Sequence, residues 1–358
     1  MVTNRYKYAI EMYRDDGTNL GQVPVEMDPQ PALEWTWLTG LRRNKLELSD
    51  GTGSSAVLPV WHREVGEPYI EGFRVTILSD EDDGITEDFS TLYFKREADQ
   101  ARLNLIASKR LRKDETVRYV TLAFLNDAHA MPAARPQFKT REAPPDIRIV
   151  ESDFGSFVNR SQLEGEVTTE DIPIVIPRRI LDETRELALA SRDKETGGVL
   201  IGHLHRDRTV PEVFVEVTAQ IKAAHAVADA ARLTFTPDTW SAVQAAVDLR
   251  GEGETWVAWW HSHVPVGVSC KDCPEEKRAV CPLVNGFFSQ DDRQLHRTVF
   301  FKAFASALTL SLKDEGDGSE ITHKLYGWRH GVIEPRGFYV LNNGLSTSGG
   351  ERHAERQP

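Results

Sequence analysis

Apolar and polar positions follow two different patterns along the chain. From Tyr6 to about Phe138, short apolar stretches typical of strands, such as YKYAIEMY, FRVTIL and VRYVTLAFL, are separated by turn sequences such as SDGTG and SDEDDG. A helix is expected around Glu97 to Leu111, although the spacing of its apolar residues is imperfect. This part of the sequence therefore predicts a β-rich or α+β N-terminal domain.

The composition changes after about residue 130, where proline, acidic and polar residues predominate. Such a segment buries little apolar area and is typical of a connector. We therefore expect an N-terminal domain over residues 1–145, a linker over 146–170, and a second domain with its own core over 171–342. The last residues, 343–358, have the composition of a frayed tail.

Strands and helices alternate in the second predicted domain. IPIVIP predicts a short strand, and Pro177 begins a helix that runs to about Asp193 with one apolar face. GGVLIGHL and EVFVEVTA predict a pair of strands, and a second helix is expected between Thr236 as its N-cap and Gly251. TWVAWW is apolar throughout and predicts a central strand, SQDDRQLHRTVFF predicts a helix, and SALTLSL and KLYGWR predict two further strands. The expected fold class is α/β of the α+β kind, with a mixed sheet flanked by helices.

Composition and charge exclude several classes of protein. Apolar residues make up 40% of the 358 positions and charged residues 27%, which is the balance of an ordinary globular protein. The formal net charge of -12 argues against a nucleic-acid partner. The first twenty residues contain charges throughout, and no apolar run approaches about 18 residues, so neither a signal peptide nor a membrane partner is expected. The predicted location is cytoplasmic.

His261 and His263 directly follow the predicted central strand. Alternate residues of an extended chain face the same side, so both imidazoles can bind one ion. Catalytic zinc typically takes three protein ligands and one water, and Asp292 at the start of the next helix can be the third ligand. Each candidate also has an ordinary explanation when it is taken alone. A His-x-His pair is usually structural, Ser289 with Asp292 can simply cap a helix, and Glu195 can be a solvated turn residue.

These residues are stronger evidence for a metal site together than singly, because they occur in a characteristic order. A glutamate before GGVLIG, HSH at the end of WVAWW, and a later Ser-x-x-Asp together resemble the prokaryotic type of the JAMM (JAB/MPN-plus) zinc metallopeptidase family over residues 172–312. The resemblance implies a JAB/MPN-like fold in which the two histidines and Asp292 bind zinc. It further implies that Glu195 is the general acid and base and that Ser289 stabilises the oxyanion.

One spacing departs from the family pattern. Residues 264–288 separate the second histidine from the serine, which is longer than the family usually has. A rival pair with the same mutual spacing, Ser269 and Asp272, lies closer to HSH. Ser289 and Asp292 are preferred because FFS precedes them and a helix-like sequence follows.

All three cysteines, Cys270, Cys273 and Cys281, lie in this longer segment. A Cys-x-x-Cys with one further thiolate suits a second, structural zinc ion, whose fourth ligand would be His296, Asp272 or another histidine. Two alternatives stay open. A thiolate can bind the catalytic zinc and inhibit the free enzyme, or the three thiols can be unliganded.

The resemblance implies a hydrolase, specifically a deubiquitinase-like isopeptidase that cuts an amide or isopeptide bond at the C-terminus of a ubiquitin-like modifier. The modifier or its conjugate would be the partner, and the N-terminal domain would position it. Two other functions fit the same sequence: a catalytically inactive MPN-type scaffold, and a zinc hydrolase of a small amide. The sequence does not determine the oligomeric state.

Overall fold

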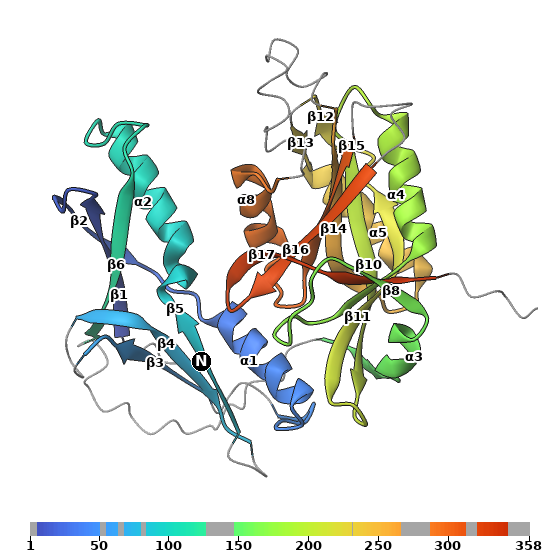
Figure 1. Ribbon diagram of the computed structural model, residues 1–358, viewed down its shortest axis with the longest axis horizontal. Helices are drawn as coiled ribbons and strands as arrows, with labels where there is room; N and C mark the ends of the chain where they lie inside the picture. Colours follow the sequence, from blue (N-terminus) through green and yellow to red (C-terminus); the bar gives the residue numbers. More distant parts are fainter. Residues whose placement is uncertain are drawn as a thin grey trace, which may run out of the picture.

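Two β-sheets organise the chain, and helix α1 (Gln30–Arg42) lies between them (Figure 1). The computed structural model describes residues 6–50, 55–63, 68–79, 84–126, 147–230, 232–265, 287–312 and 321–342. The predicted fold class is confirmed, because a β-rich N-terminal part precedes a mixed sheet flanked by helices. No helix in these ranges is long and apolar enough to cross a membrane.

The first sheet has six strands in the order β2-β1-β6-β4-β3, with β5 paired to β4. All of its pairings are antiparallel. A stacked pair of rings, Phe73 and Phe89, lies in its core beside Phe94. The helix expected around Glu97 is present as α2. The elements are β1 (Tyr6–Arg14), β2 (Asn19–Val25), β3 (Ser55–Trp61), β4 (Tyr69–Ile77), β5 (Ile85–Ser90), the 3-10 turn η2 (Thr91–Phe94), α2 (Lys95–Ala107) and β6 (Val117–Leu125).

The second sheet has ten strands in the order β17-β16-β15-β14-β10-β11-β9-β18-β8, with β7 paired to β10. The predicted central position of TWVAWW is confirmed, since β14 lies antiparallel to β10 and parallel to β15. The strands are β7 (Ile149–Glu151), β8 (Ser161–Glu164), β9 (Ile174–Pro177), β10 (Gly197–Asp207), β11 (Glu212–Lys222), β14 (Thr255–His263), β15 (Ser306–Leu312), β16 (Ile321–Arg329), β17 (Val332–Arg336) and β18 (Phe338–Leu341). A separate small ladder joins β12 (Val227–Ala228) to β13 (Leu233–Thr234).

Four described helices accompany the second sheet, and the expected helix ends are clear in α5. Thr236 accepts a hydrogen bond from Thr239 N at its start, and Gly251 ends it in the left-handed conformation at φ 66°. The four helices are α3 (Phe154–Val158), α4 (Arg178–Ala190), α5 (Pro237–Arg250) and α8 (Gln290–Val299).

The segment expected as a linker contributes to the second sheet. Within residues 147–164, β7 pairs with β10, β8 pairs with β18, and α3 lies between these two strands in the chain. The physical reason is a small apolar anchor inside a polar sequence. The rings of Phe154 and Phe157 pack on Phe214 of β11, with centroids 4.9 and 5.1 Å away. The connector is therefore shorter than its composition indicates.

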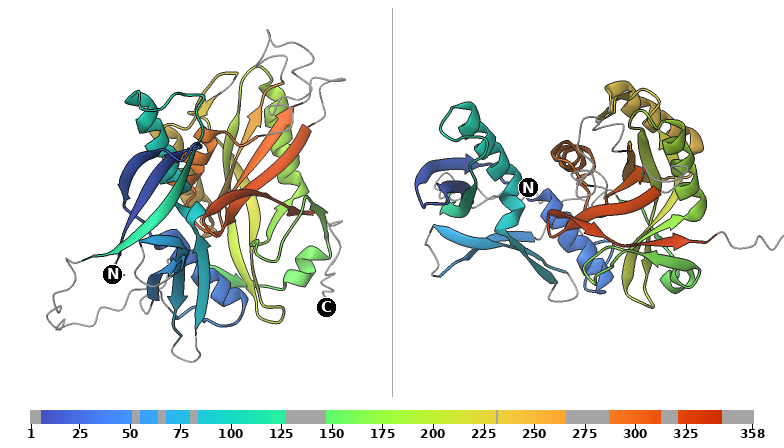
Figure 2. Two further views of the ribbon diagram at one scale, coloured as in Figure 1. Left: turned by 60° about the vertical axis from the view of Figure 1, so that its left-hand side comes forward. Right: turned by 45° about the horizontal axis from the view of Figure 1, so that its top comes forward.

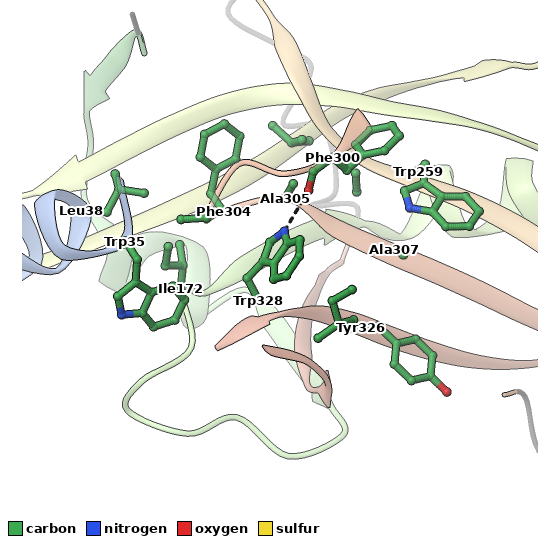
Figure 3. Close-up of a cluster of buried hydrophobic side chains, with 14 of the residues drawn as sticks. Trp35, Leu38, Ile172, Trp259, Phe300, Phe304, Ala305, Ala307, Tyr326 and Trp328 are labelled. Carbon is green, nitrogen blue, oxygen red and sulfur yellow. Dashed lines mark hydrogen bonds between the residues drawn. The ribbon is translucent and has the colours of Figure 1, made fainter. Parts of the chain in front are cut away.

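Helix α1 was not among the expected elements, and it joins the two sheets (Figure 2). Every residue from Ala32 to Arg42 is buried. Trp35 and Leu38 belong to one buried cluster with Ile172 and Trp328 of the second part, and Trp35 lies beside Ile172 (Figure 3). Buried apolar residues of both parts form one continuous cluster, instead of the two separate cores that the composition predicts.

Polar and ionic contacts of two arginines reinforce this joint. Arg206 of β10 is 1% exposed and contacts Glu47 Oε2, Asn44 Oδ1 and Leu46 O of the N-terminal part, each at 3.2 Å. Arg208 also reaches Glu47, at 3.1 Å, but its side chain is 50% exposed. The two arginines therefore share a partner and differ in burial.

We expect Arg206→Ala to lower the free energy of unfolding by at least about 2 kcal/mol, because hydrogen bonds of a charged group contribute about 1.5–3 kcal/mol each. Arg208→Ala is the matched control and should cost less than about 1 kcal/mol, as exposed ion pairs do. Urea unfolding followed by tryptophan fluorescence measures both. Equal losses in the two variants would show that burial at this joint contributes little.

Candidate metal centre

The middle residue of HSH holds the start of β10 against the end of β14. Ser262 N donates to Thr196 O at 2.8 Å, and Thr196 N donates to Ser262 Oγ at 3.1 Å. Gly197 is the register partner of His261. This clamp places Glu195, the residue before Thr196, beside the two histidines.

The two histidines lie on β14 with their Nε2 atoms 2.9 Å apart. Asp292 Oδ1 of α8 is 3.6 Å from His261 Nε2. One ligand atom from each of the three residues lies within 4.8 Å of the others. Both histidines are buried, with His261 1% and His263 5% exposed. The surrounding protein therefore shields the two rings from water.

Burial sets the protonation state of these imidazoles. It lowers the pKa of His261 and takes that of His263 to about 3, with the neighbouring imidazole adding to the second shift and Asp292 opposing both. Both rings are therefore neutral at pH 7, which is the form that binds metal. Two neutral imidazoles and one carboxylate facing one point are a donor set that fits zinc.

Aromatic neighbours fix the ring planes. Trp259 stacks on His261 with centroids 4.9 Å apart and an interplanar angle of 13°, and Phe287 stacks on His263 at 5.3 Å. Ser311 Oγ of β15 lies 3.5 Å from His263 Nδ1. The rings are thus oriented before any ion arrives, which reduces the conformational cost of binding.

Ser289 and Asp292 form a helix cap as well as facing the histidines. Ser289 Oγ accepts from Asp292 N at 3.0 Å, and Asp292 Oδ2 accepts from Ser289 N at 2.7 Å. The cap uses Oδ2, so Oδ1 remains directed at His261. The ordinary explanation of this pair and its proposed role as ligand and donor are therefore compatible.

Glu195 has an unusual acidity. Burial raises its pKa to about 8, and the negative charges of Asp292 and Asp229 add to the shift. Glu195 directly precedes Thr196, which is hydrogen-bonded to Ser262 between the two histidines, so this residue lies close to the His and Asp group. A carboxyl with a pKa near neutrality can both accept and release a proton at working pH.

The structure brings together His261, His263 and Asp292 and places Glu195 and Ser289 beside them, while the catalytic roles of the last two stay predictions. Sequence reasoning missed Ser262 and Ser311 as supports of the site. The alternation along β14 contains a signal for Ser262, because the residue between two ligands must face the opposite side and can contact β10.

The second metal site stays a prediction. Cys270, Cys273 and Cys281, like the rival pair Ser269 and Asp272, lie outside the described residues. His296, the suggested fourth ligand, is fully buried in α8, and its Nδ1 accepts the Trp259 Nε1 hydrogen at 3.1 Å. Burial lowers the pKa of His296 to about 3. This ring is held as a neutral acceptor in an aromatic environment.

Comparisons with known proteins support the same class. Residues 177–268 match the family model described as prokaryotic homologs of the JAB domain. The match contains Glu195 and both histidines and ends before Ser289, and it supports a JAB/MPN-type domain in the C-terminal part of the chain. A search of curated proteins finds no match.

Among solved structures, a protein from Desulfitobacterium hafniense, determined in solution, aligns over 99% of its length with 51% of this chain. Its sequence identity is 17% and the TM-score is 0.29, so this likeness carries no argument about the fold.

Proposed function

We propose that the protein is a zinc-dependent peptidase that hydrolyses an amide or isopeptide bond at the C-terminus of a ubiquitin-like modifier. The observation that carries this proposal is the convergence of His261, His263 and Asp292 on one point, with the carboxyl group of Glu195 beside it. The JAB family contains metal-dependent isopeptidases and inactive scaffolds. A complete set of ligand candidates favours the enzyme over the scaffold.

The two histidines and Asp292 would hold the ion. Bound zinc lowers the pKa of water to about 7 and polarises a carbonyl group. Glu195 accepts a proton from the attacking water and delivers it to the departing nitrogen, which is a lysine ε-amine in an isopeptide. The hydroxyl of Ser289, whose oxygen already accepts from Asp292 N, donates its hydrogen to the carbonyl oxygen as negative charge develops there.

Zinc content is the first test. The double variant His261→Ala/His263→Ala is expected to hold one zinc ion fewer per chain than the wild type, because two of three ligands are gone. The difference in zinc content between the two proteins decides, because any ion bound at a separate cysteine site would be present in both. His62→Ala/His225→Ala, which removes two exposed histidines, is the control and should keep the wild-type content.

Hydrolysis is measured on the same proteins with a ubiquitin-like protein that carries a fluorogenic amide at its C-terminus. The wild type should release the fluorophore and the His261/His263 variant should not. Equal zinc in both proteins would contradict the site. A protein that loses zinc as expected but cleaves nothing would be a scaffold, and one that cleaves only short peptide amides would be a small-amide hydrolase.

A further inference from the structure

A cavity of about 420 Å³ is lined by residues of both parts of the molecule, including Arg96 of α2 and Arg297 of α8. The ribbons of α2 and α8 face each other in Figures 1 and 2. Met27 and Phe94 of the N-terminal part and Trp328 of β16 give it a buried apolar lining. Phe301, just after α8, also lines it and is 44% exposed, although it is a large aromatic side chain. A cavity with both apolar and charged lining at a domain junction, and with an exposed aromatic side chain, is typical of a binding site.

Two arginines line the cavity from opposite walls, Arg297 from α8 and Arg96 from α2. Arg297 is half-buried. Burial lowers its pKa below the ordinary value, and the like charges of Arg293 and Arg96 add to this shift. A half-buried cation near two other cations gains more from an anionic partner than an exposed one does.

The carboxylates near this arginine do not pair with it. Asp99 and Glu97 favour its charged form from a distance, but neither forms an ion pair or hydrogen bond with it among the described contacts. Asp99 is engaged by Lys95 Nζ at 2.7 Å. The cavity lining also contains three carboxylates, those of Glu26, Asp28 and Glu97. Glu26 and Asp28 are exposed, Asp28 Oδ1 accepts from Gln30 N at 3.0 Å, and none of the three pairs with Arg297 among the described contacts. The guanidinium of Arg297 is therefore available to a carboxylate from outside the chain.

Helix α8 connects this cavity to the metal centre. Asp292 lies in its first turn and Arg297 five residues further on, a rise of about 8 Å along the helix axis. The chain after α8 is fixed by two hydrogen bonds, from Trp328 Nε1 to Phe300 O at 2.8 Å (Figure 3) and from Ala303 N to Glu34 Oε1 at 2.6 Å. The cavity therefore lies at a set distance from the ligand group.

We propose that this cavity recognises a segment of the substrate polypeptide in which an apolar side chain stands next to a carboxylate. The apolar side chain packs between Phe301 and the Met27 wall, and the carboxylate pairs with Arg297. The cavity volume of about 420 Å³ admits side chains of this size. That the bound polypeptide is the substrate rests on the proposed peptidase function. The binding of a peptide with an apolar side chain beside a carboxylate does not depend on that function.

The test uses the full-length protein and a library of random heptapeptides displayed on beads. The wild type is expected to enrich peptides in which an apolar residue adjoins Asp or Glu. Arg297→Glu should enrich an apolar residue beside Lys or Arg instead, because the sign of the recognising charge is reversed. Phe301→Ala should lose the apolar preference and keep the acidic one.

Matched controls lie outside the cavity. Arg118→Glu reverses an exposed arginine of β6, and Leu249→Ala removes a leucine of α5 that is 88% exposed. Both should return the wild-type motif. Circular dichroism and zinc content should be unchanged in all four variants, so that a lost motif is not a lost fold.

A fluorescein-labelled peptide with the selected motif then gives affinities, and Arg297→Glu should weaken its binding at least tenfold. No enriched motif with the wild type, or the same motif with Arg297→Glu, would overturn the proposal. Binding is scored without hydrolysis, so a failure here leaves the peptidase proposal standing. Zinc content and hydrolysis of the His261→Ala/His263→Ala variant are measured without the peptide library, so the peptidase proposal can fail while the peptide motif is still found.

Discussion

Glu195→Gln is expected to reduce hydrolysis by about 10²–10⁴-fold, the usual contribution of a positioned general acid and base. An amide has nearly the shape of the carboxyl group but cannot carry the proton from the water to the leaving amine. Zinc content and thermal unfolding should stay at wild-type values, because Glu195 is not one of the three grouped ligands. The measurement is the rate of fluorophore release under zinc-saturating conditions.

Glu252→Gln is the matched control for this experiment, since Glu252 is an exposed glutamate after α5. It should hydrolyse the substrate at the wild-type rate. If Glu195→Gln retained activity within tenfold of the wild type, the proton would travel by another group. If it lost zinc together with activity, Glu195 would be a ligand and its role would have to be reassigned.

Local signals made much of the second sheet predictable. Proline and threonine mark the starts of α4 and α5, a left-handed glycine marks the end of α5, and the wholly apolar TWVAWW marks a strand with neighbours on both sides. Each of these features depends on residues within a few positions of one another. These elements can therefore be predicted from local sequence patterns, without knowledge of the tertiary fold.

Helix α1 has no such signal, because almost all of its faces are buried. Its sequence, QPALEWTWLTGLR, lacks a polar stripe, since one side packs on the first sheet and the other on the second. A sequence pattern detects the contrast between a buried and an exposed face, and here that contrast is missing. The joint between the two parts was for this reason invisible in the sequence.

The candidate site also combines local features that the sequence predicts with long-range features that it does not predict. HSH and Ser-x-x-Asp are short local patterns that can be recognised directly. The place of Glu195 depends on the register between β10 and β14, and the cavity at Arg297 depends on how the N-terminal part docks against α8. Long-range contacts of this kind become visible only when the sheets are assembled.

The continuous core leads to the last prediction: a fragment that begins at residue 147 will not fold into a soluble domain. It retains β7, α3 and β8, so no described strand of the second sheet is lost. It lacks Trp35 and Leu38 of α1, which belong to the same buried cluster as Ile172 and Trp328 (Figure 3). Each large apolar side chain contributes about 1.5–3 kcal/mol when buried, and a domain has only about 5–15 kcal/mol in total.

Sedimentation and urea unfolding of the fragment provide the measurement, with the full-length protein as reference. The full chain should unfold in one cooperative transition, because its two parts share a core. Linking residues 28–50 back to the fragment should increase its soluble yield, since these residues restore α1 and Glu47, the partner of Arg206. A soluble fragment with a cooperative transition and full zinc content would instead support the two separate cores that the composition predicts, and α1 would then be a docking element whose removal leaves the metal centre intact.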